Sequence, residues 1–325
     1  MITLDCTFRD GGYYNGWNFD IQLARDYLTV IEKSGIQAVE IGFRSPPDKQ
    51  TGSFAKVTDE FIEDNLYTPD VEYFGVMINE SDMNFALIKK LFKYSDKAPI
   101  NLVRVATHFK DINSSEEVVK SLKDLGYYVS MQLMQAADKS FDEIKQVGKK
   151  LENWKAIDVL YLADSLGGMN HDSVNYAFKA IKEGWSGLVG FHGHNNKGQA
   201  LNNSLEAVDI GVDWIDGTMM GMGRGPGNTQ TEYLLSELNK RGFGEYEVED
   251  VYQLVLNKFI PLKRKYEWGP SLLYYLTAEY NIHPTYVQKM LSENYSMDNI
   301  LKAVFYLEHK ETNFFNKDLF EGSLK

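Results

Sequence analysis

Short apolar runs alternate with longer amphipathic segments along the first two thirds of this chain. Eight runs rich in β-branched and aromatic residues are separated by segments in which apolar residues recur at helical spacing. The runs lie near residues 2–7, 37–43, 72–78, 101–107, 127–133, 157–163, 188–193 and 213–217. Eight strand–helix units in about 220 residues favour an α/β fold of the (β/α)8 barrel type, with parallel strands. A doubly wound open sheet is the alternative that has the same alternation.

The character of the chain changes after residue 245. Aromatic-rich helical patterns occupy 251–266, 271–280, 284–294 and 297–309, and none of them reads as a strand. We therefore predict a catalytic barrel over residues 1–240 and a helical region over 245–325. The helical region is expected to form an interface or a lid, and its last residues, 313–325, are expected to be a mobile tail.

Composition excludes several classes of function. The chain has 46 acidic and 34 basic residues, a net charge of −12 and a pI near 5.1, which argues against a protein that tracks nucleic-acid phosphates. The sequence has no leader-like start and no run of eighteen apolar residues, so we expect a cytoplasmic protein without membrane contact. The single cysteine, Cys6, excludes an intramolecular disulfide and a thiolate zinc cluster, and is predicted to be a small buried residue of the first strand.

Two histidines fall two residues apart on the seventh predicted strand. Alternate side chains of a strand point to the same face, so His192 and His194 are expected to present two imidazoles to one spot. Imidazole is the commonest nitrogen ligand of divalent metals. On its own, this pair is compatible equally with a metal site and with two ordinary histidines.

A carboxylate at the other end of the sequence completes a ligand set. Asp10 follows the first predicted strand and precedes two glycines that permit a sharp turn. In a closed eight-stranded ring only the eighth strand separates the first from the seventh, at about 4.8 Å per strand. Asp10, His192 and His194 can therefore converge at the carboxyl ends of the strands, where barrel enzymes place their active sites. One oxygen and two nitrogens leave positions open for water or substrate, as a catalytic metal requires.

A glycine-rich segment, 221–228 (GMGRGPGN), follows the eighth predicted strand. No register satisfies the dinucleotide pattern G-x-G-x-x-G, because Pro226 or Asn228 occupies the third glycine position. We interpret the segment as a substrate-binding loop whose backbone amides, at Gly223 and Gly225, face the site.

Five ordered segments resemble one enzyme family. They are 7–11 (TFRDG), 39–43 (VEIGF), 162–165 (LADS), 192–195 (HGHN) and the loop 221–228. In this order they resemble the metal-dependent barrel family of HMG-CoA lyase and 4-hydroxy-2-oxovalerate aldolase, over residues 1–240. The segments 269–274 (GPSLLY) and 281–283 (NIH) are similar to the helical C-terminal region of the hydroxy-oxovalerate aldolases, which places the resemblance closest to that branch.

The resemblance implies a ligand set and a cofactor. It implies that Asp10, His192 and His194 bind a divalent cation, with Asn228 as a further ligand as in the lyase branch. Mn²⁺ or Mg²⁺ is the expected cation, and Zn²⁺ or Co²⁺ the alternative.

The resemblance also implies roles around the metal. Arg9 would stabilise the negative charge of an enolate, and Glu40 would orient Arg9 or a water at the metal. Asp164 and Ser165, at the end of the sixth predicted strand, would contact the substrate.

One position departs from the aldolase pattern. Three residues after the metal-binding aspartate, those aldolases carry a histidine that takes the substrate hydroxyl proton, whereas this chain has Tyr13. An unperturbed phenol has a pKa near 10 and is a poor base at neutral pH. Either the metal lowers the pKa of Tyr13, or His108, which follows the fourth predicted strand, is the base.

The predicted function is that of a divalent-metal lyase or aldolase that cleaves or forms a carbon–carbon bond next to a 2-oxo acid. An acyl-CoA condensing synthase or an HMG-CoA-lyase-like enzyme of the same family is one alternative, and a non-haem iron oxygenase is another. A binding or assembly subunit that lost catalysis is the alternative outside enzymes, and Tyr13 keeps it open. Besides a small 2-oxo acid, a second copy of the chain or a partner dehydrogenase could contact the C-terminal helices.

Overall fold

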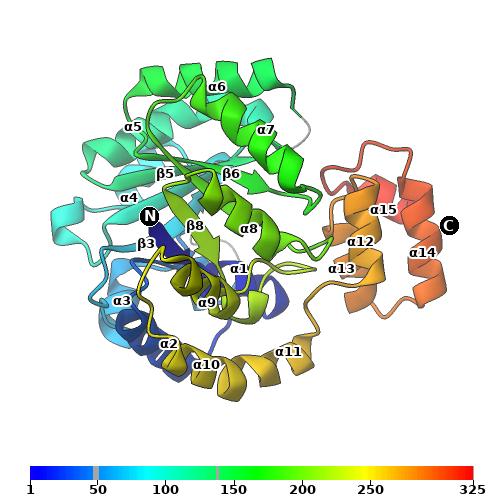
Figure 1. Ribbon diagram of the computed structural model, residues 1–325, viewed down its shortest axis with the longest axis horizontal. Helices are drawn as coiled ribbons and strands as arrows, with labels where there is room; N and C mark the ends of the chain where they lie inside the picture. Colours follow the sequence, from blue (N-terminus) through cyan, green and yellow to red (C-terminus); the bar gives the residue numbers. More distant parts are fainter. Residues whose placement is uncertain (47–50, 137–138, 325) are drawn as a thin grey trace.

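A closed barrel of parallel strands forms the centre of the molecule (Figure 1). The computed structural model describes residues 1–46, 51–136 and 139–324, and these form eight strands that pair in sequence order. The strands are β1 (Ile2–Asp5), β2 (Ala38–Phe43), β3 (Tyr73–Asn79), β4 (Leu102–His108), β5 (Tyr128–Met134), β6 (Val159–Asp164), β7 (Leu188–Gly193) and β8 (Trp214–Gly217). β1 pairs with β8 from Ile2 opposite Trp214 to Asp5 opposite Gly217. This closure confirms the predicted barrel and excludes the open sheet.

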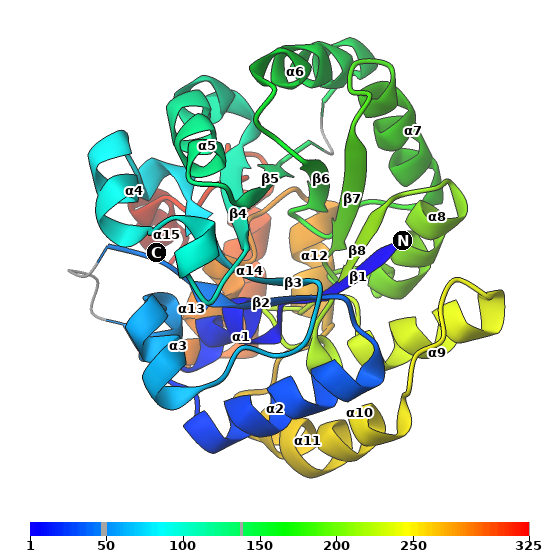
Figure 2. The same cartoon turned by 90° about the vertical axis from the view of Figure 1, so that its left-hand side faces the viewer.

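Helices cover the outside of the barrel (Figure 2). One helix follows each strand, preceded after β1 by the single turn α1 (Thr7–Asp10). The covering helices are α2 (Ile21–Ser34), α3 (Asp59–Asn65), α4 (Phe85–Leu91), α5 (Ser115–Asp124), α6 (Phe141–Trp154), α7 (His171–Lys182), α8 (Ala200–Asp209) and α9 (Thr231–Arg241). Local chemistry sets their ends. At the start of α2, for example, the side chain of Asp20 accepts a hydrogen bond from Leu23 N. At its end, Gly35 adopts a left-handed conformation with φ of 77°.

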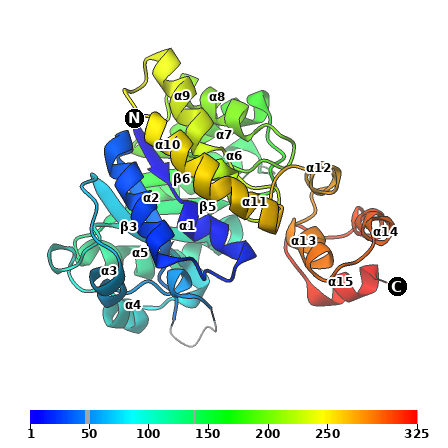
Figure 3. The same ribbon diagram turned by 90° about the horizontal axis from the view of Figure 1, so that it is seen from below.

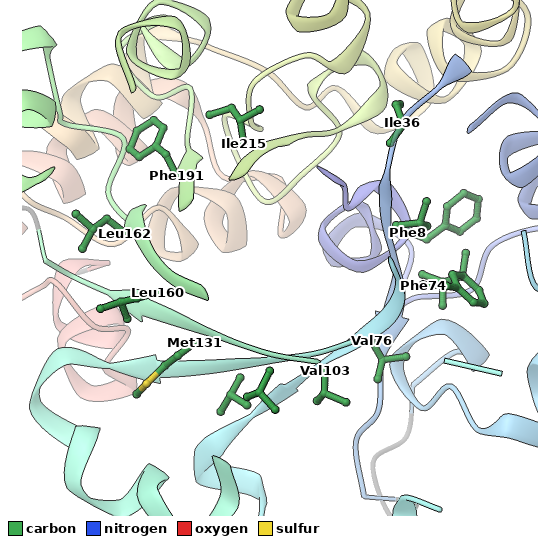
Figure 4. Packing of buried hydrophobic residues seen from close by; sticks show 14 of the residues in the cluster. Phe8, Ile36, Phe74, Val76, Val103, Met131, Leu160, Leu162, Phe191 and Ile215 are labelled. Atoms are coloured by element: carbon green, nitrogen blue, oxygen red, sulfur yellow. The ribbon is translucent and has the colours of Figure 1, made fainter. Parts of the chain in front are cut away.

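The alternation of side chains along each strand produces two separate interiors. In β4, Val103 and Val105 join the main core between strands and helices, whereas Leu102 and Ala106 belong to small clusters inside the barrel. Figure 4 shows members of the main core arranged around the ring of strands. The inward position between Leu102 and Ala106 is Arg104, which is fully buried. The middle of the barrel interior is therefore charged, and the charges need partners there.

The region after residue 245 contains two kinds of packing. Its helices are α10 (Glu249–Leu254), α11 (Ile260–Tyr266), α12 (Leu272–Glu279), α13 (Thr285–Ser292), α14 (Met297–Leu307) and α15 (Lys317–Ser323). A π-helical turn, Val255–Phe259, joins α10 to α11, and this helical stretch buries Val251 and Phe259 in the main core. Helices α12 to α15 instead share a second core (Figure 3). The change from the main core to the second core falls near Trp268.

Part of the expected mobile tail is a helix that packs in a core. α15 occupies residues 317–323 and buries Phe320, which is 3% exposed, in the second core. Lys325, the last residue of the predicted tail and of the predicted helical region, lies outside the described residues. We call helices α12 to α15 the C-terminal unit. Among the helices described, none combines the length and the apolar character that crossing a membrane would require.

Candidate metal centre and active site

Asp10 lies on the helical turn α1 and not on strand β1. The strand ends at Asp5, whose Oδ1 accepts from the backbone N of Thr7 at 2.9 Å and from the Thr7 hydroxyl. These hydrogen bonds turn the chain, and Asp10 N then donates to Cys6 O at 3.0 Å. One prediction is corrected: Cys6 follows the strand instead of belonging to it, whereas Asp10 follows the strand as expected. Cys6 is buried, as expected.

Asp10, His192 and His194 converge at the carboxyl end of the barrel. Each offers a ligand atom, and the three atoms lie within 4.8 Å of one another. His192 is on β7 and His194 follows the end of that strand; their rings meet edge to face with centroids 4.9 Å apart. Asp10 and His192 are almost fully buried, at 2% and 4% exposed. The geometry matches the three-residue ligand set expected from the sequence.

Each imidazole has an oxygen partner on Nδ1, which leaves its Nε2 for a ligand. His194 Nδ1 donates to the backbone O of Asp164 at 2.7 Å, and His192 Nδ1 lies 2.8 Å from Asp216 Oδ2. Oxygen partners on Nδ1 leave the Nε2 lone pairs for a metal. His192 Nε2 is buried without a hydrogen-bond partner among the described residues, 3.3 Å from Asp10 Oδ2. An orphaned buried nitrogen beside a carboxylate fits a bound cation.

Asn228 reaches the same carboxylate from the glycine-rich loop. Its Nδ2 donates to Asp10 Oδ2 at 2.6 Å, and its Oδ1 is buried without a partner among the described residues. Asn228 also forms an isolated β-bridge with His194. The preceding residue, Gly227, has φ of 77° and lies so close to Gly221 O that a Cβ at this position would clash with it. The free amide oxygen is available as the further ligand that the resemblance implies.

A second group, Cys6 with His192 and Asp216, also satisfies the spacing of a metal site. It is the weaker candidate. Burial raises the pKa of the Cys6 thiol well above its usual value, which disfavours the thiolate that a metal needs, and Asp216 is already paired with Arg104 Nη2 at 2.6 Å. Asp10 is also paired with an arginine, Arg9, at 2.9 Å, but its group contains no thiol that must lose a proton.

The charges inside the barrel form a closed ring of contacts. Asp10 Oδ1 lies 2.9 Å from Arg9 Nη1, and Arg9 Nε donates to Glu40 Oε1. Glu40 Oε2 lies 3.3 Å from Arg104 Nη1, and Arg104 in turn binds Asp216. Asp216 and His192 then lead back to Asp10. Glu40 therefore orients Arg9 directly, as one of its two expected roles requires.

Arg104 and Asp216 were not predicted as site residues. The available signal was a charged side chain at an inward position of an otherwise apolar strand, in LVRVATH and WIDG.

The ring of contacts explains why the Asp10 carboxylate is deprotonated. Burial alone would raise the pKa of Asp10, but Arg9 and His192 outweigh it and hold that pKa far below the usual range. Asp10 is an anion at any physiological pH.

Asp10, His192 and His194 line a cavity of about 330 Å³ together with Arg9, whereas Asn228 is not among the described residues of its lining. Tyr13, His108 and Ser165, which the sequence analysis assigned to proton transfer and substrate contact, also line it. Tyr13 is 37% exposed and stands edge to face with Trp17, at 4.8 Å between ring centroids. His108 is partly buried, and its Nδ1 has no hydrogen-bond partner among the described residues.

Three predicted substrate contacts lie elsewhere. The Asp164 carboxylate accepts from Gly168 N at 3.0 Å and Met169 N at 3.2 Å, and burial raises its pKa to about 7. It shapes the loop after β6 and is not among the described residues lining the cavity. Gly223 and Gly225 are also absent from that lining; Gly225 O accepts from Tyr14 OH at 2.7 Å. The residue between the two glycines, Arg224, lines the cavity instead.

The C-terminal unit supplies part of the cavity wall. His283, Phe314 and Phe315 line it, although sequence analysis assigned none of them to the site. The Phe314 ring lies edge to face against His108, at 4.8 Å between centroids. Burial, and then Arg224, lowers the pKa of His283 to about 2, so this imidazole is neutral. No local sequence pattern marks these residues, because a separate helical unit brings them to the site.

The barrel and its converging donors define the class of protein: a (β/α)8-barrel enzyme with a candidate divalent-metal centre at the carboxyl ends of its strands. The family model described as HMGL-like matches residues 1–255. The chain belongs to the HMGL-like family, as its motifs predicted, and is a metal-dependent carbon–carbon lyase.

Curated relatives point to one branch of the family. A 4-hydroxy-2-oxovalerate aldolase of Carboxydothermus hydrogenoformans is 30% identical over 262 residues, 78% of this chain and 76% of that protein. The protein of the same name from Thermus thermophilus is 30% identical over 252 residues, 74% of this chain and 69% of that protein.

Solved structures agree with the fold. The N-terminal domain of a putative aldolase from Bacteroides vulgatus superimposes with a TM-score of 0.84 at 29% identity, over 93% of this chain and all of that one. HMG-CoA lyase of Bacillus subtilis superimposes with a TM-score of 0.65 at 15% identity, over 82% of this chain and 94% of that one, which shows the shared fold alone.

Proposed function

We propose that this chain is a class II aldolase that cleaves a 4-hydroxy-2-oxo acid into pyruvate and an aldehyde, or runs the reaction in reverse. The observation that carries the proposal is the convergence of Asp10, His192 and His194 beside Arg9, in one cavity. The names of the 30% identical relatives support the aldolase over the acyl-CoA synthase, the oxygenase and the non-catalytic subunit.

Asp10, His192 and His194 would hold the divalent cation, with Asn228 Oδ1 as a further donor. Oxygen and imidazole donors with open positions suit Mn²⁺ or Mg²⁺, and Co²⁺ or Zn²⁺ in the second place. When bound, such a cation stabilises negative charge that develops on a substrate oxygen. Ring contacts to Asp216 and the carbonyl of Asp164 keep both imidazoles in the ligand orientation.

Arg9 would stabilise the enolate oxygen. Its guanidinium lies in the cavity and is held between Asp10 and Glu40, so it requires no reorganisation during the reaction. When the C3–C4 bond of the substrate breaks, its electrons move to the C2 oxo oxygen, and Arg9 meets that charge. Protonation of the enolate at C3 then gives pyruvate.

We infer that His108 takes the C4 hydroxyl proton, in preference to Tyr13. Burial lowers the pKa of His108, so its imidazole is neutral near pH 7 and can accept a proton. Its Nδ1 is unoccupied and its ring lines the cavity. Tyr13 lines the same cavity, but a phenol is a less suitable general base than an imidazole.

Ser165 is the proposed contact for the substrate carboxylate end, since its side chain lines the cavity next to the loop of Asp164. A second copy of the chain or a partner dehydrogenase at the C-terminal unit remains a prediction. That unit exposes several large apolar side chains, among them Leu272, Met297 and Phe305.

The test follows pyruvate release. Purified protein is incubated with 4-hydroxy-2-oxovalerate and longer 4-hydroxy-2-oxo acids after chelation and reloading with Mn²⁺, Mg²⁺, Co²⁺ or Zn²⁺, and pyruvate is detected with lactate dehydrogenase. We expect metal-dependent release. Release that is unaffected by chelation would overturn the metal mechanism, and no release from any member of the series would overturn the aldolase proposal.

A further inference from the structure

We propose that Arg224 binds an anionic group, a carboxylate or a phosphate, at the aldehyde end of the substrate. This inference rests on the proposed function and deepens it, because it names the substrate class: a 4-hydroxy-2-oxo acid that carries a second anion beyond C4. Arg224 would act as a specificity-determining residue and not as a group that reacts.

Arg224 stands where two cavities meet. It lines the cavity of the metal centre and also a larger cavity of about 1260 Å³, between the barrel and the C-terminal unit. Tyr13 also lines both, and the Arg224 guanidinium carbon lies 5.3 Å from the centroid of the Tyr13 ring. A substrate held at the metal centre would therefore extend its far end past Tyr13 and Arg224.

No anion of the protein neutralises Arg224. Within residues 1–46, 51–136 and 139–324, its side chain has no ion pair and no hydrogen bond, and its Nε is buried without a partner. The Asp10 carboxylate is already engaged by Arg9 Nη1 and Asn228 Nδ2. A guanidinium held without a carboxylate in a half-buried site is costly unless a ligand supplies the anion.

The histidines beside Arg224 in the cavity wall do not supply the missing anion. Burial is the main reason that the pKa values of His108 and His283 are lowered, and Arg224 lowers both further. These two imidazoles are thus uncharged. They can donate or accept hydrogen bonds, but neither can balance the charge of Arg224.

The larger cavity is also cationic, on a protein with a net charge of −12. Besides Arg224, its lining includes Lys263, Lys265 and Lys289 against two carboxylates, Glu267 and Asp298. A positively charged cavity on an acidic protein attracts small anions, and the proposed 2-oxo acid substrates are anions. Arginine is suited to such a contact because its planar fork binds carboxylate and phosphate with two parallel hydrogen bonds.

The chemistry balances for such a substrate. With 4-hydroxy-2-oxoglutarate, the base takes the C4 hydroxyl proton, the C3–C4 bond breaks toward the C2 oxo group, and the C4 hydroxyl becomes the aldehyde of glyoxylate. The enolate gains a proton at C3 and becomes pyruvate. Arg224 holds the distal carboxylate throughout and exchanges neither protons nor electrons.

The kinetic test compares two substrates of equal chain length, 4-hydroxy-2-oxoglutarate and 4-hydroxy-2-oxovalerate, which differ in the distal carboxylate. We expect kcat/KM of the wild type to favour the carboxylate by about tenfold or more, the range of a charge-assisted hydrogen bond. Arg224→Gln should reduce the ratio of the two kcat/KM values by a similar factor, and Arg224→Lys should retain part of it. Arg241→Gln, a surface arginine paired with Asp209, is the matched control and should leave the ratio unchanged.

A binding test does not depend on turnover. Equilibrium dialysis of the holoenzyme compares 2-oxoglutarate, 2-oxoadipate and 2-oxopimelate with the monocarboxylic 2-oxo acids of the same lengths, and 2-oxo-4-phosphonobutanoate represents the phosphate class. At least one dianion should bind about tenfold more tightly than its neutral-tailed counterpart, and Arg224→Gln should abolish the difference. The phosphonate arm distinguishes a phosphate-bearing substrate from a carboxylate-bearing one.

The outcomes separate the two proposals. Equal binding and equal kcat/KM for dianionic and neutral-tailed compounds in the wild type would overturn the role of Arg224, whatever the folding of the variants, and would leave the aldolase intact. A dianion preference that Arg224→Gln removes, without pyruvate release from any 4-hydroxy-2-oxo acid, would support the anion site and overturn the aldolase. A preference that survives in Arg224→Gln would also overturn the assignment.

Discussion

His192 Nδ1 lies 2.8 Å from Asp216 Oδ2, and the same oxygen accepts from Arg104 Nη2 at 2.6 Å. A carboxylate on β8 thus sets the orientation of a proposed ligand on β7, and a buried guanidinium on β4 holds that carboxylate in place. Arrangements of this kind keep a ligand imidazole in one tautomer and raise its basicity. The proposed metal centre therefore depends on side chains that do not touch the metal.

Asp216→Asn should weaken metal affinity by about 10- to 100-fold, because the amide cannot replace the negative charge that Asp216 presents to His192 Nδ1. The measurement is titration of the chelated protein with Mn²⁺. Asp213→Asn is the control, since Asp213 accepts from Val189 N at 2.9 Å near the opposite end of the strand. Unchanged affinity in Asp216→Asn would remove the carboxylate from the proposed centre.

Asp10→Asn, His192→Ala and His194→Ala should each lose most of the bound metal while the barrel stays folded, since all three lie at the carboxyl end and outside the main core. Elemental analysis after dialysis, with circular dichroism as the folding check, measures both. His171→Ala is the matched control, because His171 is exposed and paired with Glu206 at 2.7 Å. Full metal content in all three variants would contradict the ligand set.

Arg9→Ala should keep the metal and lower kcat by about 10²- to 10³-fold, the usual effect of losing one donor to a developing oxyanion. Steady-state kinetics on a 4-hydroxy-2-oxo acid, beside metal analysis, measure the effect. Arg25→Ala on the exposed side of α2 serves as the control. A raised KM with unchanged kcat would instead assign Arg9 to uniform substrate binding.

His108→Ala should lower kcat by about 10²- to 10⁴-fold, whereas Tyr13→Phe should retain most of it, because the imidazole can accept the hydroxyl proton and the phenol cannot. Both residues line the cavity, so the pair is a matched comparison. Pyruvate release across a pH series measures it. An inactive Tyr13→Phe beside an active His108→Ala would move the base to the tyrosine.

In Glu232→Gln, the free energy of unfolding should fall less between acidic and neutral pH than it does in the wild type. Burial raises the pKa of Glu232 to about 7, whereas the unfolded chain releases this proton near pH 4.5. The folded state therefore binds more protons between these values, and the free energy of unfolding falls as pH rises through them, by roughly 3 kcal/mol in total. Denaturant unfolding at about pH 5 and about pH 8 should show a smaller difference in Glu232→Gln than in the wild type. Glu237→Gln, on the exposed side of the same helix, should behave like the wild type.

The strand pattern was predictable because it depends on local composition. Every predicted strand lies within about two residues of an observed one. The first predicted strand extends two residues too far, because Asp5 turns the chain through its hydrogen bonds to Thr7. Apolar periodicity reports burial, whereas it carries no record of a side-chain hydrogen bond that ends a strand.

The part of the candidate site that lies within sequence motifs of the barrel was predictable. Asp10, His192 and His194 could be brought together because barrel closure makes their strands near neighbours. His283 and Phe314 could not, since their position depends on how the C-terminal unit packs over the barrel. The resemblance assigned Asp164 to substrate binding, whereas its carboxylate accepts hydrogen bonds from backbone amides of its own loop.

The second core of helices α12 to α15 has a consequence for the history of the enzyme. Residues that close the far side of the cavity are carried by a body whose packing is largely independent of the barrel, whereas the groups proposed for bond cleavage belong to the barrel. Mutations can accumulate in one body without disturbing the other. Chimeras that join this barrel to the helical unit of a relative should therefore keep the reaction and the anion preference of the barrel parent, whereas the wall formed by His283, Phe314 and Phe315 would come from the other parent.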